Sequence, residues 1–528
     1  MFLRDLGRDP GALRMLLAAS LSLFASGLAP RVFSPGLASV QAAVRARPET
    51  EVLLLIAAVL SAGALLVGGV LGDADGRRRI LRWALAALVV TGFSGIVFTD
   101  GVLSLAVRFI GVGSASIVLP MALAGVATRY EGIPRATAIG LAYGAYGAAT
   151  AAAPVLLTVL GPTGGQWPAY LAAGIIAVIA LGVVRTGWED LPAPGRDART
   201  GIVATAIWAF GVVVMTAGVI GFQGEGADRV RLAFLVVGGG FLVAGIAFGR
   251  RRSADGPPAR VQRRQVAVAL FVGFVIAYAQ SAALLQVPLY FQLILRYEPA
   301  AAVIATIPFM VALVVAGPVA GILLSRFRPR TLVVLGVVAV GLGNVLIALI
   351  LRPGAAYPGF ALSFLLIGAG FVIATTVRTA IIFASVPRGL PATAAALNEA
   401  SVSLGARAGL VVVTVLITTL ALDSYAASLV GRPADEIASS VDAFRQLLIA
   451  INMPQYGAVV GGITTTDGAA YAAAYTDAVR TVLLGTGLVA LVAAPLAWLG
   501  LGRGDPLRTV WEHRDERMTT ADGTPIRG

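Results

Sequence analysis

Long apolar segments alternate with short polar ones along most of this chain. A helix needs about 20 predominantly apolar residues to cross the hydrocarbon core of a bilayer, and fourteen segments approach or exceed that length. The predicted spans cover residues 14–39, 52–72, 80–99, 102–127, 136–160, 167–186, 201–222, 230–249, 265–294, 300–325, 331–351, 358–386, 392–422 and 476–501. We therefore expect an all-α integral membrane protein with 14 transmembrane helices.

Two related arginine-rich turns divide these spans into halves. The turn at Gly69–Arg79 follows the second span, and a similar turn at Gly321–Arg330 follows the tenth, 252 positions later. Spans seven and eight have no counterpart in either half, and parallel repeats of six spans are typical of transporters. We expect an N-terminal six-helix bundle at 1–187, a linker with two extra transmembrane helices at 188–264, a C-terminal six-helix bundle at 265–501 that includes an outer loop at 423–475, and a cytoplasmic tail at 502–528.

The arginines are distributed unevenly across the predicted membrane. All 40 basic residues are Arg, and most fall in loops on one side of the bilayer. This asymmetry predicts that both termini are cytoplasmic, and it accounts for the net charge of +13 without a nucleic-acid partner. The first span could be read as a signal peptide, but its apolar run continues past any cleavage site. We expect a multi-pass protein of a cell membrane, and the residue usage suggests a GC-rich, bacterial genome.

Composition narrows the possible chemistry. With 58% hydrophobic and 13% charged residues, the chain has too much apolar surface for a soluble domain. It has no cysteine, and its one histidine, His513, lies in the polar tail, which excludes thiolate and histidine metal sites within the membrane. The glycines at 238–240 lie inside a span without a following Lys, so they form no phosphate loop. We expect no enzyme activity, no metal and no cofactor.

The first turn also carries a sequence motif, G-x-L-x-D-x-x-G-R-[KR]. In this motif a glycine permits the tight turn, and the acidic residue can pair with an Arg or with a helix end. The matching residues are Gly69, Leu71, Asp73, Gly76, Arg77 and Arg78. In this motif the chain resembles the major facilitator superfamily, and specifically its 14-span drug:proton antiporter branch. The resemblance implies the major facilitator fold and a role for Asp73 and Arg77 in stabilising the outward-facing state. The alternative is an orientation signal with no switching role.

The resemblance covers roughly residues 12–500, with departures inside the spans. Span four keeps Arg108 but lacks the Gln that the family places after it. Span five keeps Gly140 and Pro154 of the family's helix-packing motif, yet Leu157 and Thr158 replace its closing glycine pair. The Asp that many members carry in span one is also missing. The residue that couples transport to an ion must therefore be sought elsewhere.

Ionisable side chains inside a span cost about 2.5 to 3.5 kcal/mol each at the bilayer centre, and they usually mark function or a buried partner. Here they are Arg31, Arg108, Arg378, Glu399 and Arg407. Arg378 and Glu399 lie about equally far from the centre of a predicted hairpin, so we expect them to pair. A fixed ion pair would only lock the hairpin, whereas a pair that breaks and reforms would let Glu399 carry a proton.

The other intramembrane arginines each allow a functional and a structural interpretation. Arg407 falls roughly on the same helix face as Glu399, and Arg407 and Arg108 are further coupling candidates. Arg108 either faces the transport cavity or bonds backbone carbonyls. For the substrate cavity we select Arg31, Gln280, Gln286 and Tyr290, because a polar group in a span must be satisfied by protein or water. Each of the four could instead snorkel or form an interhelical bond.

These features predict a secondary active transporter. The resemblance implies multidrug efflux, in which a proton-coupled antiporter exports lipophilic or amphiphilic small molecules by alternating access around a mid-membrane site. We expect a monomer in the lipid bilayer, with the proton as coupling ion. Two alternatives stay open: an uncoupled carrier of anions or lipids, suggested by the surplus of Arg, and a non-transporting scaffold or sensor. The intact Asp73, Gly76 and Arg77 argue against the scaffold.

Overall fold

The computed structural model describes residues 9–33, 63–98, 101–164, 167–188, 236–241, 260–352, 354–386, 390–451 and 468–502, and the single positions 211, 214 and 233. These residues are almost entirely helical and contain no strand. Ten of the described helices are long and apolar enough to cross a bilayer, which agrees with the predicted fold class. Most of the predicted linker at 188–264, with its two spans, lies outside the described residues, as does nearly all of the tail at 502–528.

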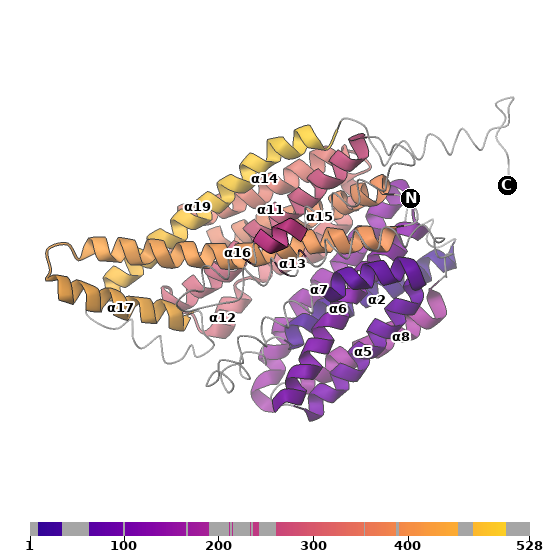
Figure 1. Cartoon of the computed structure of the whole chain (residues 1–528), viewed down its shortest axis with the longest axis horizontal. Coiled ribbons are helices and arrows are strands. Elements are labelled where there is room, and N and C mark those ends of the chain that lie inside the picture. The colour runs from indigo at the N-terminus through magenta and orange to yellow at the C-terminus, as the bar shows by residue number, and fades with distance from the viewer. Residues whose placement is uncertain are drawn as a thin grey trace.

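The N-terminal half is a bundle of helices whose chain order follows the predicted spans. Its described helices are α2 (Pro10–Phe33), a helix at 63–75, α5 (Arg77–Val97), α6 (Gly101–Arg129), α7 (Gly132–Gly164) and α8 (Trp167–Gly187). The C-terminal half contains α11 (Arg260–Leu293), α12 (Pro299–Ile304), α13 (Ile307–Leu323), α14 (Pro329–Ile350), α15 (Tyr357–Ser385), α16 (Pro391–Ser428), α17 (Ala434–Ile451) and α19 (Gly468–Gly500). Figure 1 shows the halves as two bundles that meet where α7 lies beside α13.

One predicted span is broken in the structure. The segment expected at 300–325 forms α12 and α13, with a turn at 305–306 between them. Pro308 is the second residue of α13. Proline lacks an N–H and disfavours helical geometry in the residue before it, so a new helix tends to start at this point. The hydroxyl of Thr306 donates to the carbonyl of Val303 and so satisfies part of the interrupted backbone.

Another departure lies at the same end of the C-terminal half as this break. The span expected at 392–422 continues as α16 to Ser428, and a helix of that length reaches about 57 Å, roughly twice the hydrocarbon thickness. Its projecting end packs with α17 and α19 through three aromatic rings, since Tyr425, Phe444 and Tyr471 have mutual centroid distances of 4.5–5.1 Å. The predicted outer loop at 423–475 thus holds an amphipathic helix, α17.

The two halves meet along two seams at the end of the molecule that carries both arginine-rich turns, here called the turn end. In the first seam, Gly69 on the helix at 63–75 faces Ala392 and Ala396 at the start of α16. In the second seam, α13 crosses α7 so closely that a Cβ at Gly140 or Gly317 would overlap the backbone of the other. Small residues permit this approach.

Candidate functional site

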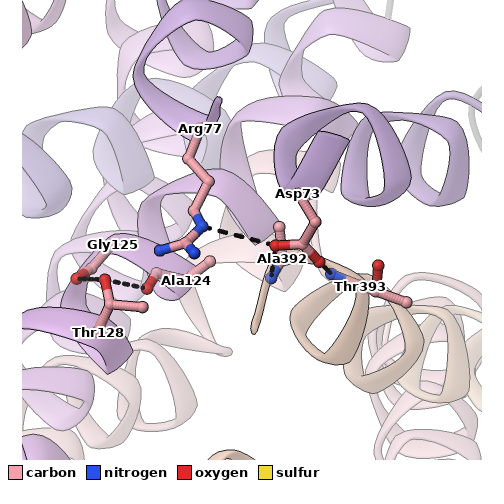
Figure 2. A network of polar contacts seen from close by, with 7 residues as sticks. All are labelled: Asp73, Arg77, Ala124, Gly125, Thr128, Ala392 and Thr393. Carbon is pink, nitrogen blue, oxygen red and sulfur yellow. Dashed lines mark hydrogen bonds and ion pairs between the residues drawn. The ribbon is translucent and has the colours of Figure 1, made fainter. Parts of the chain in front are cut away.

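The carboxylate of Asp73 joins the two halves at the first seam. It accepts hydrogen bonds from the backbone N–H groups of Ala392, at 3.0 Å, and Thr393, at 2.7 Å. Arg77 lies next to it, with Nε 3.5 Å from Oδ1, and Figure 2 shows Arg77 between Asp73 and α6. Asp73 is only 1% exposed, so its charge is satisfied almost entirely by this contact.

The local sequence explains why the contact forms. Pro391 occupies the first position of α16, and the next backbone N–H groups have no partner within the helix. The helix start also carries a partial positive charge that favours a carboxylate. Gly76, with a φ of 98°, ends the helix at 63–75 and lets α5 begin at Arg77. Asp73 therefore caps a helix of the other half.

Burial and hydrogen bonding act in opposite directions on Asp73, which lies beyond the end of the predicted span at 52–72. Burial raises the pKa of Asp73 above its ordinary value, while the N–H groups of Thr393 and Ala392 and the charge of Arg77 oppose that shift. The net pKa shift is upward. The first seam thus contains a titratable group that accepts hydrogen bonds from the start of α16.

A second polar contact between the halves lies deeper in the membrane. Tyr143 on α7 donates to Glu399 Oε1 on α16 at 2.5 Å. Asn398 Nδ2 donates to the same carboxylate oxygen at 2.9 Å, and Arg378 Nη1 donates to Asn398 Oδ1 at 2.6 Å. Thr379 Oγ1 lies 3.1 Å from Asn398 Nδ2. These residues form one hydrogen-bonded network, here called the inter-half network.

The structure brings Arg378 and Glu399 together, but not as a direct ion pair. Asn398 lies between them and bonds both. Arg378 is fully buried, and its Nε and Nη2 have no partner among the described residues. Glu399 remains partly exposed. The expected pairing is therefore replaced, in this arrangement, by a bridge through a neutral amide.

The remaining arginines occupy different surroundings. Arg108 is 3% exposed and donates to the carbonyl of Phe33 and to Ser104 Oγ, both at 3.1 Å, which corresponds to the carbonyl-bonded alternative. Arg31 is half-buried and donates to the carbonyl of Gly27 at 2.9 Å. Arg407 is half-buried on α16, eight residues after Glu399.

The predicted cavity residues of α11 divide in the same way. Gln286 donates to Thr414 Oγ1 at 3.3 Å and accepts from Tyr475 at 3.4 Å. Tyr290 accepts from Thr476 at 3.5 Å. The bonds of Gln286 and Tyr290 are therefore interhelical bonds inside the C-terminal half. The side chain of Gln280 is half-buried. Gly140 lies in the second seam, and the side chain of Pro154 lies outside the described residues.

Asn398 was not among the predicted site residues, although an amide next to the one carboxylate in an apolar span was a usable signal. No partner for Glu399 was predicted in the other half. Tyr143 is 256 positions away in sequence, and no local pattern connects the two. Their contact depends on how the halves are placed.

Two helical bundles related by a repeat, with one capped and one close-packed seam between them, are an architecture typical of membrane transporters. Residues 16–410 match the profile of the Major Facilitator Superfamily. This chain belongs to that superfamily, whose members are carriers rather than enzymes.

Individual relatives support the same assignment. The uncharacterized MFS-type transporter EfpA of Mycobacterium tuberculosis is 29% identical over 287 residues, and the match covers 52% of each chain. The chain therefore spans about half the length of that relative. Puromycin resistance protein pur8 of Streptomyces alboniger is 30% identical over 364 residues, or 65% of this chain and 68% of that one. The proton:xylose symporter XylE shares the fold, with a TM-score of 0.55 at 14% identity, over 95% of this chain and 99% of that one.

Proposed function

We propose that this protein is a proton-coupled exporter of lipophilic or amphiphilic small molecules that works by alternating access. One observation carries the proposal: the Tyr143–Glu399 hydrogen bond joins the halves through an ionisable group inside the membrane. Because Glu399 stays partly exposed, a proton can reach it while the halves are in contact. The charge of Glu399 is thereby linked to whether the turn end is closed.

The inter-half network supports a specific exchange. Opening the turn end separates α7 from α16, so Glu399 loses the Tyr143 hydroxyl. Arg378 then offers two N–H groups, Nε and Nη2, that have no partner among the described residues of the closed arrangement. A nearby guanidinium favours the ionised carboxylate, so Glu399 releases its proton when the turn end opens. A proton bound on one side is in this way delivered to the other.

The proposal assigns an orientation to the molecule. The excess of Arg at the turn end favours a cytoplasmic location for that end and for both termini. The arrangement with both seams closed is then the outward-facing one, and the contacts of Asp73 and Arg77 hold it. The protein acts as a monomer in a bacterial cell membrane, because each half supplies only part of the site and both halves lie on one chain.

The class of substrate is supported by the similarity of this chain to a drug-resistance protein. The name of the Streptomyces relative specifies resistance to puromycin, which makes puromycin a suitable first probe. The uncoupled carrier of anions or lipids is the competing function, since Arg31 and Arg407 are half-buried cations within spans. The two functions differ in whether a proton gradient drives movement.

The test uses purified protein in liposomes with an imposed pH gradient. Wild-type protein is expected to move puromycin against its gradient and to dissipate the pH gradient while doing so. Glu399→Gln removes the ionisable group and is expected to abolish the drive by the pH gradient, while counterflow of puromycin remains. Asp477→Asn, which alters an exposed carboxylate of the same half, is the matched control and should behave as wild type.

Other outcomes separate the alternatives. An unchanged pH dependence in Glu399→Gln would sink the coupling proposal. Movement that ignores the proton gradient in wild type, together with uptake of anionic amphiphiles, points to the uncoupled carrier. Absence of counterflow for every probe revives the scaffold. Tyr143→Phe keeps the carboxylate but removes the donor from the other half, and it is expected to weaken closure by about 1 kcal/mol.

A further inference from the structure

Equivalent arginines of the two turns contact equivalent helix ends. Arg78, on α5, donates from Nη2 to the carbonyl of Arg185 at the end of α8, at 2.7 Å. Arg330 lies 252 positions later, on α14, and its Cζ lies 4.1 Å from the ring centroid of Trp498 at the end of α19. The repeat thus places a guanidinium at the last helix of each half. In the second half the guanidinium stacks on an aromatic face.

A second cation approaches the same helix end. Arg264 donates from Nη2 to the carbonyl of Leu499 at 3.1 Å. The neighbouring Gln265 donates to the carbonyl of Leu501 and accepts from Ser385, so α11, α15 and α19 are tied together at this point. Arg264, Arg330 and Trp498 are here called the α19-end cluster.

The surroundings of the cluster are apolar and open. Trp498 is 39% exposed and Leu499 is 68% exposed, and Leu335 on α14, the helix that carries Arg330 and packs against α19, is also largely exposed. In a membrane protein such side chains face lipid. Arg326 and Arg328 of the second turn are exposed as well. No carboxylate lies within ion-pair distance of these four arginines in the part of the chain that the structure describes.

We propose that the α19-end cluster binds the phosphate headgroup of an anionic phospholipid. Guanidinium groups match phosphate oxygens in charge and in fork geometry. Stacking occupies the face of the Arg330 guanidinium, so its N–H edge stays available. An indole ring at the end of a span is typical of the membrane interface, and the exposed leucines beside it contact acyl chains. A lipid satisfies both parts of this surface, whereas a free anion satisfies only the cations.

Basic side chains between helices at this depth attract anionic headgroups, and each contributes roughly fivefold to the preference. The test measures binding of phosphatidylglycerol and of phosphatidylcholine to purified protein by native mass spectrometry. Wild-type protein is expected to prefer phosphatidylglycerol. The double variant Arg264→Ala/Arg330→Ala is expected to lose about fivefold of that preference for each guanidinium removed.

Matched variants distinguish a loss of lipid binding from misfolding. Arg352→Ala/Arg432→Ala removes two exposed arginines from the opposite end of the same half and should leave the preference unchanged. Arg330→Lys keeps the charge but not the fork, and Trp498→Ala keeps both cations; both should show an intermediate loss while the helical circular dichroism stays normal. An unchanged preference in the folded double variant overturns the proposal, as does an equal loss in the opposite-end variant. Displacement of the lipid by equimolar inorganic phosphate would identify a free-anion site and overturn the assignment to a lipid.

Discussion

The two arginine-rich turns occupy equivalent places in the two halves, yet they hold different partners. Gly69 and Gly321 both face the other half, the first against α16 and the second against Thr137 on α7. Four residues further on, Asp73 bonds two N–H groups of α16, whereas Ser325 donates to Ile322 in its own turn at 2.7 Å. The close-packing residue is repeated, and the charge is not.

The difference separates two ways of holding the halves together. The first seam adds a carboxyl group that accepts hydrogen bonds from the start of a helix, an interaction that is directional and sensitive to distance. The second seam depends on backbones in contact, where Gly140 and Gly317 leave no room for a side chain. A repeated architecture therefore does not require repeated chemistry. We expect that a substitution in one seam can change that seam without altering the other.

The largest effect is expected from filling the second seam. Gly140→Val places a branched side chain against the backbone of Gly317, and backbone cannot shift as a flexible side chain can. Overpacking of this kind costs about 1–3 kcal/mol, and here the whole cost falls on the closed arrangement. We expect transport in liposomes to be lost and the distance between spin labels on α7 and α13 to increase.

The control for this variant is Gly182→Val on α8. An added Cβ there meets nothing within 4 Å, so transport and label distances should remain normal. If Gly140→Val transports at the wild-type rate, then the second seam is not a rigid contact. Close backbone packing would then not be what holds it.

The next largest effect concerns the first seam. Asp73→Ala leaves the N–H groups of Ala392 and Thr393 without an acceptor, and an unsatisfied buried donor costs about 1–3 kcal/mol. We expect the population with a closed turn end to fall at least fivefold, measured by spin labels on the helix at 63–75 and on α16. Asp73→Asn retains one acceptor and should lose less. Equal label distances in Asp73→Ala and wild type would show that the cap does not hold this seam.

The parts predicted from sequence and the parts missed differ in physical origin. Apolar length determines a span locally, and the spacing of Asp73, Gly76 and Arg77 fixes a turn, so both could be anticipated. The cap on α16 and the bond from Tyr143 to Glu399 join segments 319 and 256 positions apart. These contacts depend on the placement of two rigid bundles. Pro308 was a usable signal for the break between α12 and α13. The apolar run on both sides of it instead favoured a single continuous span.

A smaller effect follows from the titration of Asp73. Burial raises the pKa of Asp73 in the closed arrangement, and the pKa returns toward its ordinary value when α16 leaves. A group with a raised pKa in one state favours that state at low pH, and this contribution disappears as the pH rises through the raised pKa. Closure of the first seam should therefore weaken as the pH rises above the ordinary Asp range. Label distances in a Glu399→Gln background isolate this effect, and Asp73→Ala should abolish it.

The smallest effect is expected from making the second turn resemble the first. Ser325→Asp introduces a carboxylate one turn beyond Gly321. The facing pairs Gly317–Gly140 and Gly321–Thr137 run toward the start of α7, where a helix N-terminus favours negative charge by about 0.3–1 kcal/mol. The closed population should rise up to fivefold, and outward–inward exchange should slow, as measured by spin-label exchange and by the transport rate. Arg326 and Arg328 lie beside this position and compete for the new carboxylate. An effect that survives Arg326→Ala/Arg328→Ala belongs to the cap on α7, and one that vanishes belongs to an ion pair within the turn. If the effect vanishes, a carboxylate in the second turn does not cap α7 as Asp73 caps α16. The two seams then differ in the helix that faces each turn, and not only in whether the turn carries Asp or Ser.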